Sequence, residues 1–176
     1  MKKFAFLALV LFTLASLASA QEDKSKRPSP PASANCAFSD GKTVKIDYSS
    51  PRMKGRKIFG GLVPYGQVWR TGANESTTFV TTADVNVGGQ SVPAGNYTIF
   101  TVPAADKWTL VISKKTGEWG TDYPGESNDL VRAPMSVSKT SGPVENFTIA
   151  FGQAGDKCTL TMDWENTRAS VDVVKK

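Results

Sequence analysis

The stretch NYTIFTVPAADKWTLVIS, residues 96–113, shows which kind of fold the chain adopts. In its second half, Trp108, Leu110 and Ile112 lie two residues apart, which is the spacing of side chains on one face of a β-strand. Its first half, residues 96–102, carries apolar side chains on both faces, a pattern typical of a strand that is covered on both sides. Residues 104–106, Ala-Ala-Asp, favour a turn between the halves. The stretch therefore predicts two antiparallel strands.

The same two-residue period extends over most of the chain. Strands are expected at residues 44–48, 77–82, 84–87, 131–137, 145–151, 160–164 and 171–173, with turn-forming residues at 88–89, 93–96, 142–143 and 152–155. Helical spacing is limited to one short turn around residues 65–70. Many short strands with frequent turns predict an all-β fold, an antiparallel β-sandwich of jelly-roll-like or immunoglobulin-like type with about nine to ten strands and little helix.

The N-terminal part predicts export from the cytoplasm. Lys2 and Lys3 precede an apolar run that ends in Ala18-Ser19-Ala20, the layout of a secretory signal peptide over residues 1–20 with cleavage after Ala20. No later segment is long and apolar enough to span a membrane, so a protein of the periplasm or the extracellular space is expected. Residues 21–33 are rich in charge, serine and proline and predict a flexible tether. The remaining residues, 34–176, are expected to form one β-sandwich domain.

Cys36 and Cys158 are the two cysteines of the chain. In an exported protein such a pair favours a disulfide, which would tie the first strand to one of the last. Two buried free thiols are the alternative.

The composition excludes several classes of function. The chain contains no histidine, so Ser-His-Asp and Cys-His catalysis are excluded and the usual zinc sites cannot be assembled. Phosphate-binding glycine loops are also missing from the sequence. The formal net charge of +5 is moderate, and basic residues are mixed with acidic ones, which disfavours nucleic-acid binding. We therefore expect no metal, no cofactor and no nucleic-acid partner.

The segment from residue 48 to 78 combines charged, aromatic, glycine and proline residues in a pattern that fits neither a strand nor a linker. Guanidinium groups bind carboxylate, phosphate or sulfate by paired hydrogen bonds, and aromatic rings stack on sugars or cations. The segment therefore predicts a site for a polar ligand, either a carbohydrate or an anion. The candidate binding residues are Arg52, Arg56, Trp69, Arg70, Asn74 and Glu75.

Three other interpretations of this segment stay open. Arg70 and Glu75 would form a buried ion pair, with Arg52 or Arg56 as a further partner, if the segment is structural. Glu75 would be a catalytic carboxylate of a hydrolase if a second acid lies close to it, the candidates being Glu118, Asp122, Glu145 and Glu165. In the third interpretation the whole domain is structural or binds another protein.

The four tryptophans divide into two groups. Trp108 and Trp164 are in phase with buried strand positions and are expected in the core. Trp69 and Trp119, together with Tyr123, are the rings that would be free to stack on a ligand.

Several motifs of the chain are similar to those of a known family. They are KGRKIFGGLVPYGQVWRTGANESTT (54–78), VPAGNYTIFTVP (92–103), KWTLVIS (107–113), Trp119-Gly120, ENFTIAF (145–151) and TMDWENT (161–167). Together they resemble a family of exported bacterial proteins that is known only as a domain of unknown function. The resemblance covers nearly the whole domain and implies its limits and its export. With no catalytic motif present, we expect a non-catalytic binding or envelope-associated module.

Overall fold

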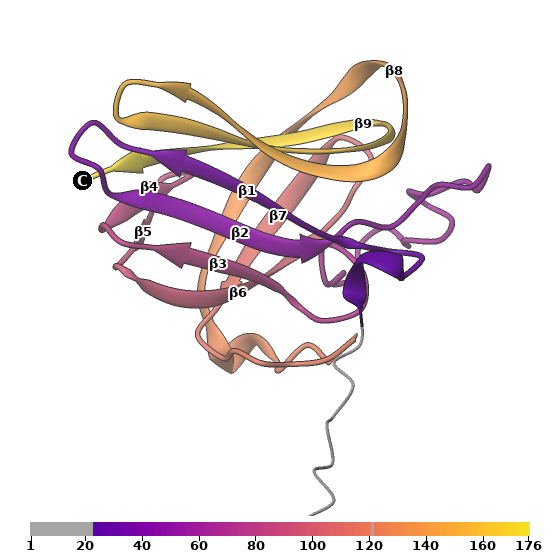
Figure 1. The fold of residues 1–176 in the computed structure, drawn as a ribbon, viewed down its shortest axis with the longest axis horizontal. Helices are drawn as coiled ribbons and strands as arrows, with labels where there is room; N and C mark the ends of the chain where they lie inside the picture. The colour runs from indigo at the N-terminus through magenta and orange to yellow at the C-terminus, as the bar shows by residue number, and fades with distance from the viewer. Residues whose placement is uncertain (1–22, 121) are drawn as a thin grey trace, which may run out of the picture.

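The computed structural model describes residues 23–120 and 122–176, so the expected signal peptide lies outside the described residues. Nine antiparallel strands form one open sheet in the order β1-β2-β3-β6-β7-β8-β9-β4-β5 (Figure 1). The strands are β1 (Pro31–Ala37), β2 (Thr43–Ser49), β3 (Thr77–Thr81), β4 (Val85–Val87), β5 (Gln90–Val92), β6 (Gly95–Val102), β7 (Lys107–Ser113), β8 (Asp129–Ala154) and β9 (Lys157–Lys175). Two 3₁₀ turns, η1 (Lys24–Lys26) and η2 (Glu126–Asn128), accompany them. The all-β prediction is confirmed.

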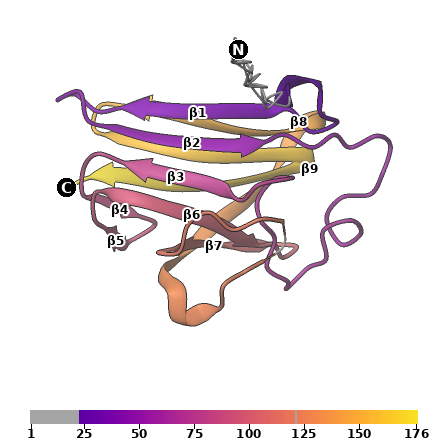
Figure 2. The ribbon, with the colours of Figure 1, turned by 60° about the horizontal axis from the view of Figure 1, so that its bottom comes forward.

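The sheet folds over itself through its two longest strands. The first part of β8 pairs with β7 and the rest pairs with β9, with register shifts between Lys139 and Thr148. The second part of β8 lies against the end of β2. There the Ile149 amide donates to the Tyr48 hydroxyl at 3.0 Å, and the hydroxyl of Ser50, the residue after β2, donates to the Phe147 carbonyl at 2.7 Å. Figure 2 shows β8 and β9 behind the layer of β1, β2, β3 and β6. One sheet thus forms two layers around a core.

Two local predictions are wrong, the chain reversal at residues 142–143 and the helical turn at residues 65–70. Residues 142–143 lie inside β8, which bends through a register shift where a chain reversal was expected, so the predicted strands 131–137 and 145–151 are parts of one strand. Residues 65–70 contain no helical turn; they form a tight turn followed by an isolated bridge between Trp69 and Thr101. The Trp69 backbone is drawn into pairing with β6, which prevents helix formation.

An aromatic cluster closes the core at the end of the sheet where the loop between β2 and β3 lies. Trp108 and Trp164 are almost completely buried, which confirms their expected place in the core. Trp69 stacks on Trp164 with centroids 5.8 Å apart and meets Phe147 edge-on at 4.9 Å. Phe59 meets Trp108 at 4.8 Å. The loop is therefore fixed to the core by Phe59 and Trp69, two of its own rings.

The predicted disulfide is present. Cys36 in β1 is bonded to Cys158 in β9, with Cα atoms 6.4 Å apart. Both cysteines are buried. The bond therefore joins the edge strand of one layer to the hairpin of the other, and the alternative of two free thiols does not hold.

The segment before β1 packs against the domain. It was expected to be a flexible tether up to residue 33, but β1 begins at Pro31 and η1 precedes it. Lys24 and Arg27 form ion pairs with Glu75, contacts that a composition argument does not anticipate. Among the described residues, no helix is long and apolar enough to cross a membrane.

Candidate functional site

Carboxylates at strand positions hold the loop between β2 and β3 in place. Glu145 in β8 accepts a hydrogen bond from the Lys54 amide at 2.9 Å. Glu165 in β9 accepts from the amides of Ile58 and Phe59, both at 3.3 Å. Because these side chains replace the missing partners of loop amides, they have a structural role here. Neither is a free second acid for Glu75.

The backbone after Arg70 has an unusual conformation. Thr71 has φ of 56°, a left-handed value that is rare for a β-branched residue and indicates local strain. Its buried hydroxyl lies 3.1 Å from that of Thr101, and its carbonyl accepts from the Thr77 hydroxyl at 2.8 Å. At Gly72 an added Cβ would lie 3.0 Å from the Ser49 carbonyl oxygen. Buried hydroxyls and a close backbone approach therefore fix the chain beside Arg70.

Arg70 and Arg56 face the same pocket, which has a volume of about 400 Å³. Most of its wall is apolar. It is lined by Ser29, Pro51, Arg56, Leu62, Val63, Pro64, Gln67, Val68, Trp69, Arg70, Gly72, Ala73 and Trp164. None of these described wall residues carries a carboxylate, so the two guanidinium charges are not balanced within the pocket.

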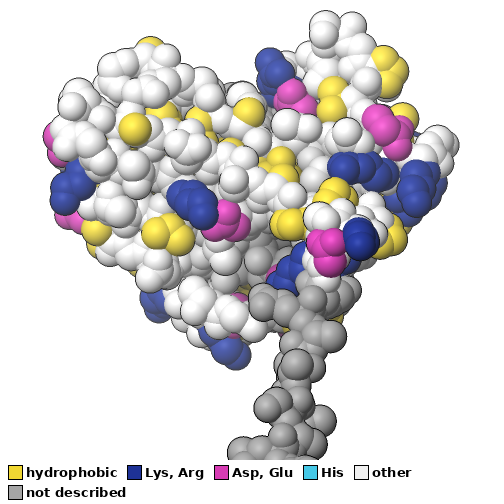
Figure 3. Space-filling model, viewed as in Figure 1, with side chains coloured by type: hydrophobic (Ala, Val, Ile, Leu, Met, Phe, Trp, Pro, Cys, Tyr) yellow, Lys and Arg dark blue, Asp and Glu magenta, His cyan; other side chains and the backbone are white. Residues whose placement is uncertain are grey.

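A second hollow adjoins this pocket. It shares Ser29, Pro51 and Arg56 with the first and adds Arg52 and Lys54, again with no acidic residue in the described wall. Figure 3 shows Lys and Arg side chains at the right of the drawn face, where Figure 1 places the loops after β2, with hydrophobic and acidic side chains among them. Basic side chains therefore continue from the pocket into the adjoining hollow, whereas the surface around them also carries acidic side chains.

The two arginines of the pocket differ in their partners. Arg56 donates to the carbonyls of Met53 at 3.0 Å and Arg52 at 2.6 Å, which fixes its guanidinium. The Nε of Arg70 is buried without a hydrogen-bond partner, and no ion pair to Arg70 occurs within residues 23–120 and 122–176. Burial lowers the pKa of Arg70, but an arginine keeps its charge in proteins. Arg70 is thus a partly buried cation that has no hydrogen-bond or ion-pair partner among the described residues.

Glu75 does not pair with Arg70, contrary to the expected ion pair. Its carboxylate binds Lys24 Nζ at 2.7 Å and Arg27 Nη1 at 2.9 Å. The hydrogen bond from Lys24, helped by a backbone hydrogen bond and by Arg27, lowers the pKa of Glu75 to about 2. The expectation failed because the partners come from a distant, preceding segment. A carboxylate this acidic and this well paired is a poor proton donor.

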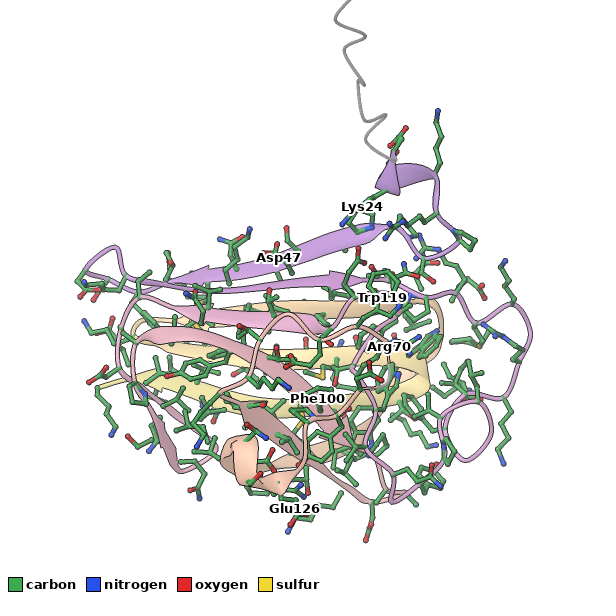
Figure 4. All side chains as sticks on the ribbon, turned by 90° about the horizontal axis from the view of Figure 1, so that it is seen from below. Lys24, Asp47, Arg70, Phe100, Trp119 and Glu126 are labelled. Atoms are coloured by element: carbon green, nitrogen blue, oxygen red, sulfur yellow. A yellow bond between two sulfur atoms is a disulfide. The ribbon has the colours of Figure 1, made fainter. Side chains whose placement is uncertain are left out.

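The structure brings together three of the six candidate binding residues, Arg56, Trp69 and Arg70. Arg52 lies in the adjoining hollow, where it also donates to the carbonyl and hydroxyl of Ser50. Asn74 and Glu75 lie outside the pocket wall, and the Asn74 amide donates to the Ser29 carbonyl at 3.0 Å. Figure 4 shows Arg70 at the same end of the molecule as Lys24 and Trp119.

Trp119 belongs to a different hollow. It is 58% exposed and lines an open depression with Glu118, Asp122 and Tyr123. The Tyr123 hydroxyl is engaged, since it donates to Asp129 at 2.8 Å. Glu75 does not line this hollow, although its backbone pairs with that of Trp119 in an isolated antiparallel bridge and the Ser76 amide donates to the Glu118 carbonyl at 3.4 Å.

Sequence reasoning missed several residues of the pocket wall. Leu62 and Val68 lie inside the segment 48–78 but follow no strand or helix period that would have predicted their place. Ser29 comes from the stretch that was expected to be a tether. The exposure of two large apolar side chains next to arginines is a signal that appears only in the structure.

The chain belongs to the DUF2911 family of proteins of unknown function, whose model matches residues 29–173. Neither the curated proteins nor the solved structures contain a match to the chain. The match begins at Ser29, a residue of the pocket wall, and covers the whole pocket.

Proposed function

We propose that this domain is a non-catalytic binding module that takes up a small anionic ligand in the pocket of Arg70 and Arg56. The observation that carries the proposal is the unpaired guanidinium of Arg70 in a wall without carboxylates. The Arg70 side chain is partly buried and its Nε is buried without a hydrogen-bond partner, which costs stability; a bound carboxylate or phosphate would supply the missing hydrogen bond and a counter-charge. Arg56, already fixed by two carbonyls, would provide a second charge-assisted contact.

An anion is favoured over a neutral carbohydrate. Sugar recognition needs many polar groups to match the hydroxyls, whereas the pocket wall is mainly apolar and its strongest polar groups are two cations. A hydrolase centred on Glu75 is less well supported, because that carboxylate is held by Lys24 and Arg27 with a pKa of about 2.

The expected place of action is outside the cytoplasm, in the periplasm or the extracellular space. The disulfide between Cys36 and Cys158 fits an oxidising compartment. N-terminal sequencing of the protein recovered from its native host would test the proposed cleavage after Ala20.

The test of binding compares Arg70→Met with Arg168→Met. Arg168 is a suitable control because it is bound to Asp163 in β9 and does not line the pocket. Ligand uptake is followed by tryptophan fluorescence, since Trp69 and Trp164 form part of the wall. We expect carboxylates or phosphates to change the fluorescence of the wild type and of Arg168→Met but not of Arg70→Met. Equal responses of all three proteins would contradict the proposal.

A further inference from the structure

We infer that the ligand is amphiphilic, with one anionic group bound at Arg70 and an apolar body lying on the loop formed by residues 62–69. This inference rests on the proposed function and specifies the class of ligand for the same pocket. A medium-chain carboxylate is the simplest molecule of this kind.

The first support is the apolar part of the wall. Leu62 and Val68 are large hydrophobic side chains that are 49% and 37% exposed, and both line the pocket. Trp69 lies between Val68 and Arg70 in the sequence and is only partly buried. Apolar side chains left open to water beside a cationic group favour a ligand that covers them while it neutralises the charge.

The second support is the small number of neutral polar side chains. Besides the indole N–H groups of Trp69 and Trp164, of which that of Trp164 donates to the Glu145 carbonyl, Ser29 and Gln67 are the neutral hydrogen-bonding side chains in the described wall. A sugar acid or a sugar phosphate would find few side-chain partners for its hydroxyl groups there, and each hydroxyl buried against the apolar wall would cost binding free energy. An alkyl chain has no such requirement.

The third support is the shape of the site. The volume of about 400 Å³ lies in the range of small-molecule pockets, roughly 300 to 1,000 Å³. The stack of Trp69 on Trp164 and the edge contact with Phe147 make the aromatic part of the wall rigid. A preformed apolar wall binds an apolar body without first having to become ordered.

The decisive experiment is isothermal titration calorimetry of the oxidised protein with hexanoate, octanoate and decanoate, each below its micelle concentration. Each methylene that becomes buried should strengthen binding about fourfold. Glucuronate and hexanol serve as probes that lack the apolar chain and the charge, respectively. We expect decanoate to bind most tightly, and Arg70→Met to abolish its binding.

A pair of matched variants tests the apolar wall. Val68→Ser should weaken decanoate binding severalfold and leave any weak binding of glucuronate unchanged. Val174→Ser is the control, because Val174 is exposed to a similar extent, 38%, but lies in β9 outside the pocket wall. It should bind decanoate as the wild type does.

The outcomes separate the two proposals. If glucuronate binds as tightly as decanoate and both depend on Arg70, the inference is overturned while the proposed function stands. If no anion binds, or if binding does not depend on Arg70, both are overturned. If phosphatidylglycerol vesicles bind the protein and monomeric decanoate does not, the partner is a lipid surface, which also overturns the inference.

Discussion

At the scale of single residues, Arg70 shows which features of the candidate site can be predicted from the sequence. Its type and its neighbours predicted a polar site, and the structure places it in a pocket with Arg56 and Trp69. The partner of Glu75 was not predictable, because Lys24 lies 51 positions away and nothing in the sequence relates the two. The positions of Trp108 and Trp164 were predictable, because burial on one strand face leaves a two-residue period.

Replacing Arg70 by Met should leave stability unchanged or raise it by up to about 1 kcal/mol, because the folded protein no longer holds a buried Nε without a hydrogen-bond partner. The aliphatic stem is kept, so packing changes little. Urea unfolding would measure the difference. Arg168→Met should behave in the opposite way and lose on the order of 1 kcal/mol, because it leaves Asp163 without its partner. A marked loss of stability in Arg70→Met would show that Arg70 has a structural partner.

The close approach at Gly72 gives a second prediction. Gly72→Ala would place a methyl group 3.0 Å from both the Ser49 carbonyl oxygen and the Thr77 hydroxyl. We expect a loss of about 1 to 3 kcal/mol in the free energy of unfolding. Gly142→Ala is the matched control, since an added Cβ there meets nothing within 4 Å. If the two alanine variants are equally stable, the backbone beside Arg70 is less constrained than described.

At the scale of elements, the segment 24–30 departs most from expectation. Its charge and proline content predicted disorder, because composition arguments weigh apolar burial and ignore specific ion pairs. Here Glu75 and Asn74 hold the segment through Lys24, Arg27 and the Ser29 carbonyl. Since Ser29 belongs to the pocket wall, the segment also completes the proposed binding site.

Release of this segment should follow the protonation of Glu75. The pKa of Glu75 is lowered from 4.5 to about 2 in the folded protein. The ionised carboxylate therefore stabilises the folded protein fully above pH 4.5, and this stabilisation is lost as the pH falls toward 2. Glu75→Gln removes the charge at every pH and should cost on the order of 1 kcal/mol, because the ion pairs are partly exposed. Trypsin should then cleave faster after Lys24 and Lys26 at neutral pH.

The control for this experiment is Glu126→Gln. Glu126 is also paired with an arginine, Arg132, but lies in η2, and the pairs that hold residues 24–29 involve Glu75 and Asn74 instead. Trypsin should cleave the Glu126→Gln variant after Lys24 and Lys26 at the same rate as the wild type. Equal cleavage of all three proteins would mean that Glu75 does not hold the segment.

At the scale of the whole molecule, the class of fold was predictable and the path of the sheet was not. Alternating side chains located most strands, but they carry no information about which strands pair. The Gly-Pro pair at 142–143 suggested a reversal, yet β8 continues through it and bends over the core. One sheet can form two layers because β8 and β9 are continuous through the bend. This continuity depends on the pairing of β8 with β7 and β9, which are distant from parts of it in the sequence.

The disulfide should be the strongest single link between the two layers. Cys36 and Cys158 are 122 positions apart, and in the chain-entropy model closing a loop of this length stabilises the folded state by about 4 to 5 kcal/mol. Cys36 also lies in β1, an edge strand that is hydrogen-bonded on one side to β2 alone. Reduction should therefore lower the melting temperature, as calorimetry with and without reductant would show.

The matched control is the double variant Cys36→Ala and Cys158→Ala, which keeps the core apolar. It should melt at a lower temperature than the oxidised wild type and should not respond to reductant. Because both cysteines are buried, reduction needs transient opening, and the wild type should lose its disulfide faster in mild denaturant. If the double variant melts at the temperature of the oxidised protein, the hydrogen bonds of Tyr48 and Ser50 to β8 suffice to hold the layers together.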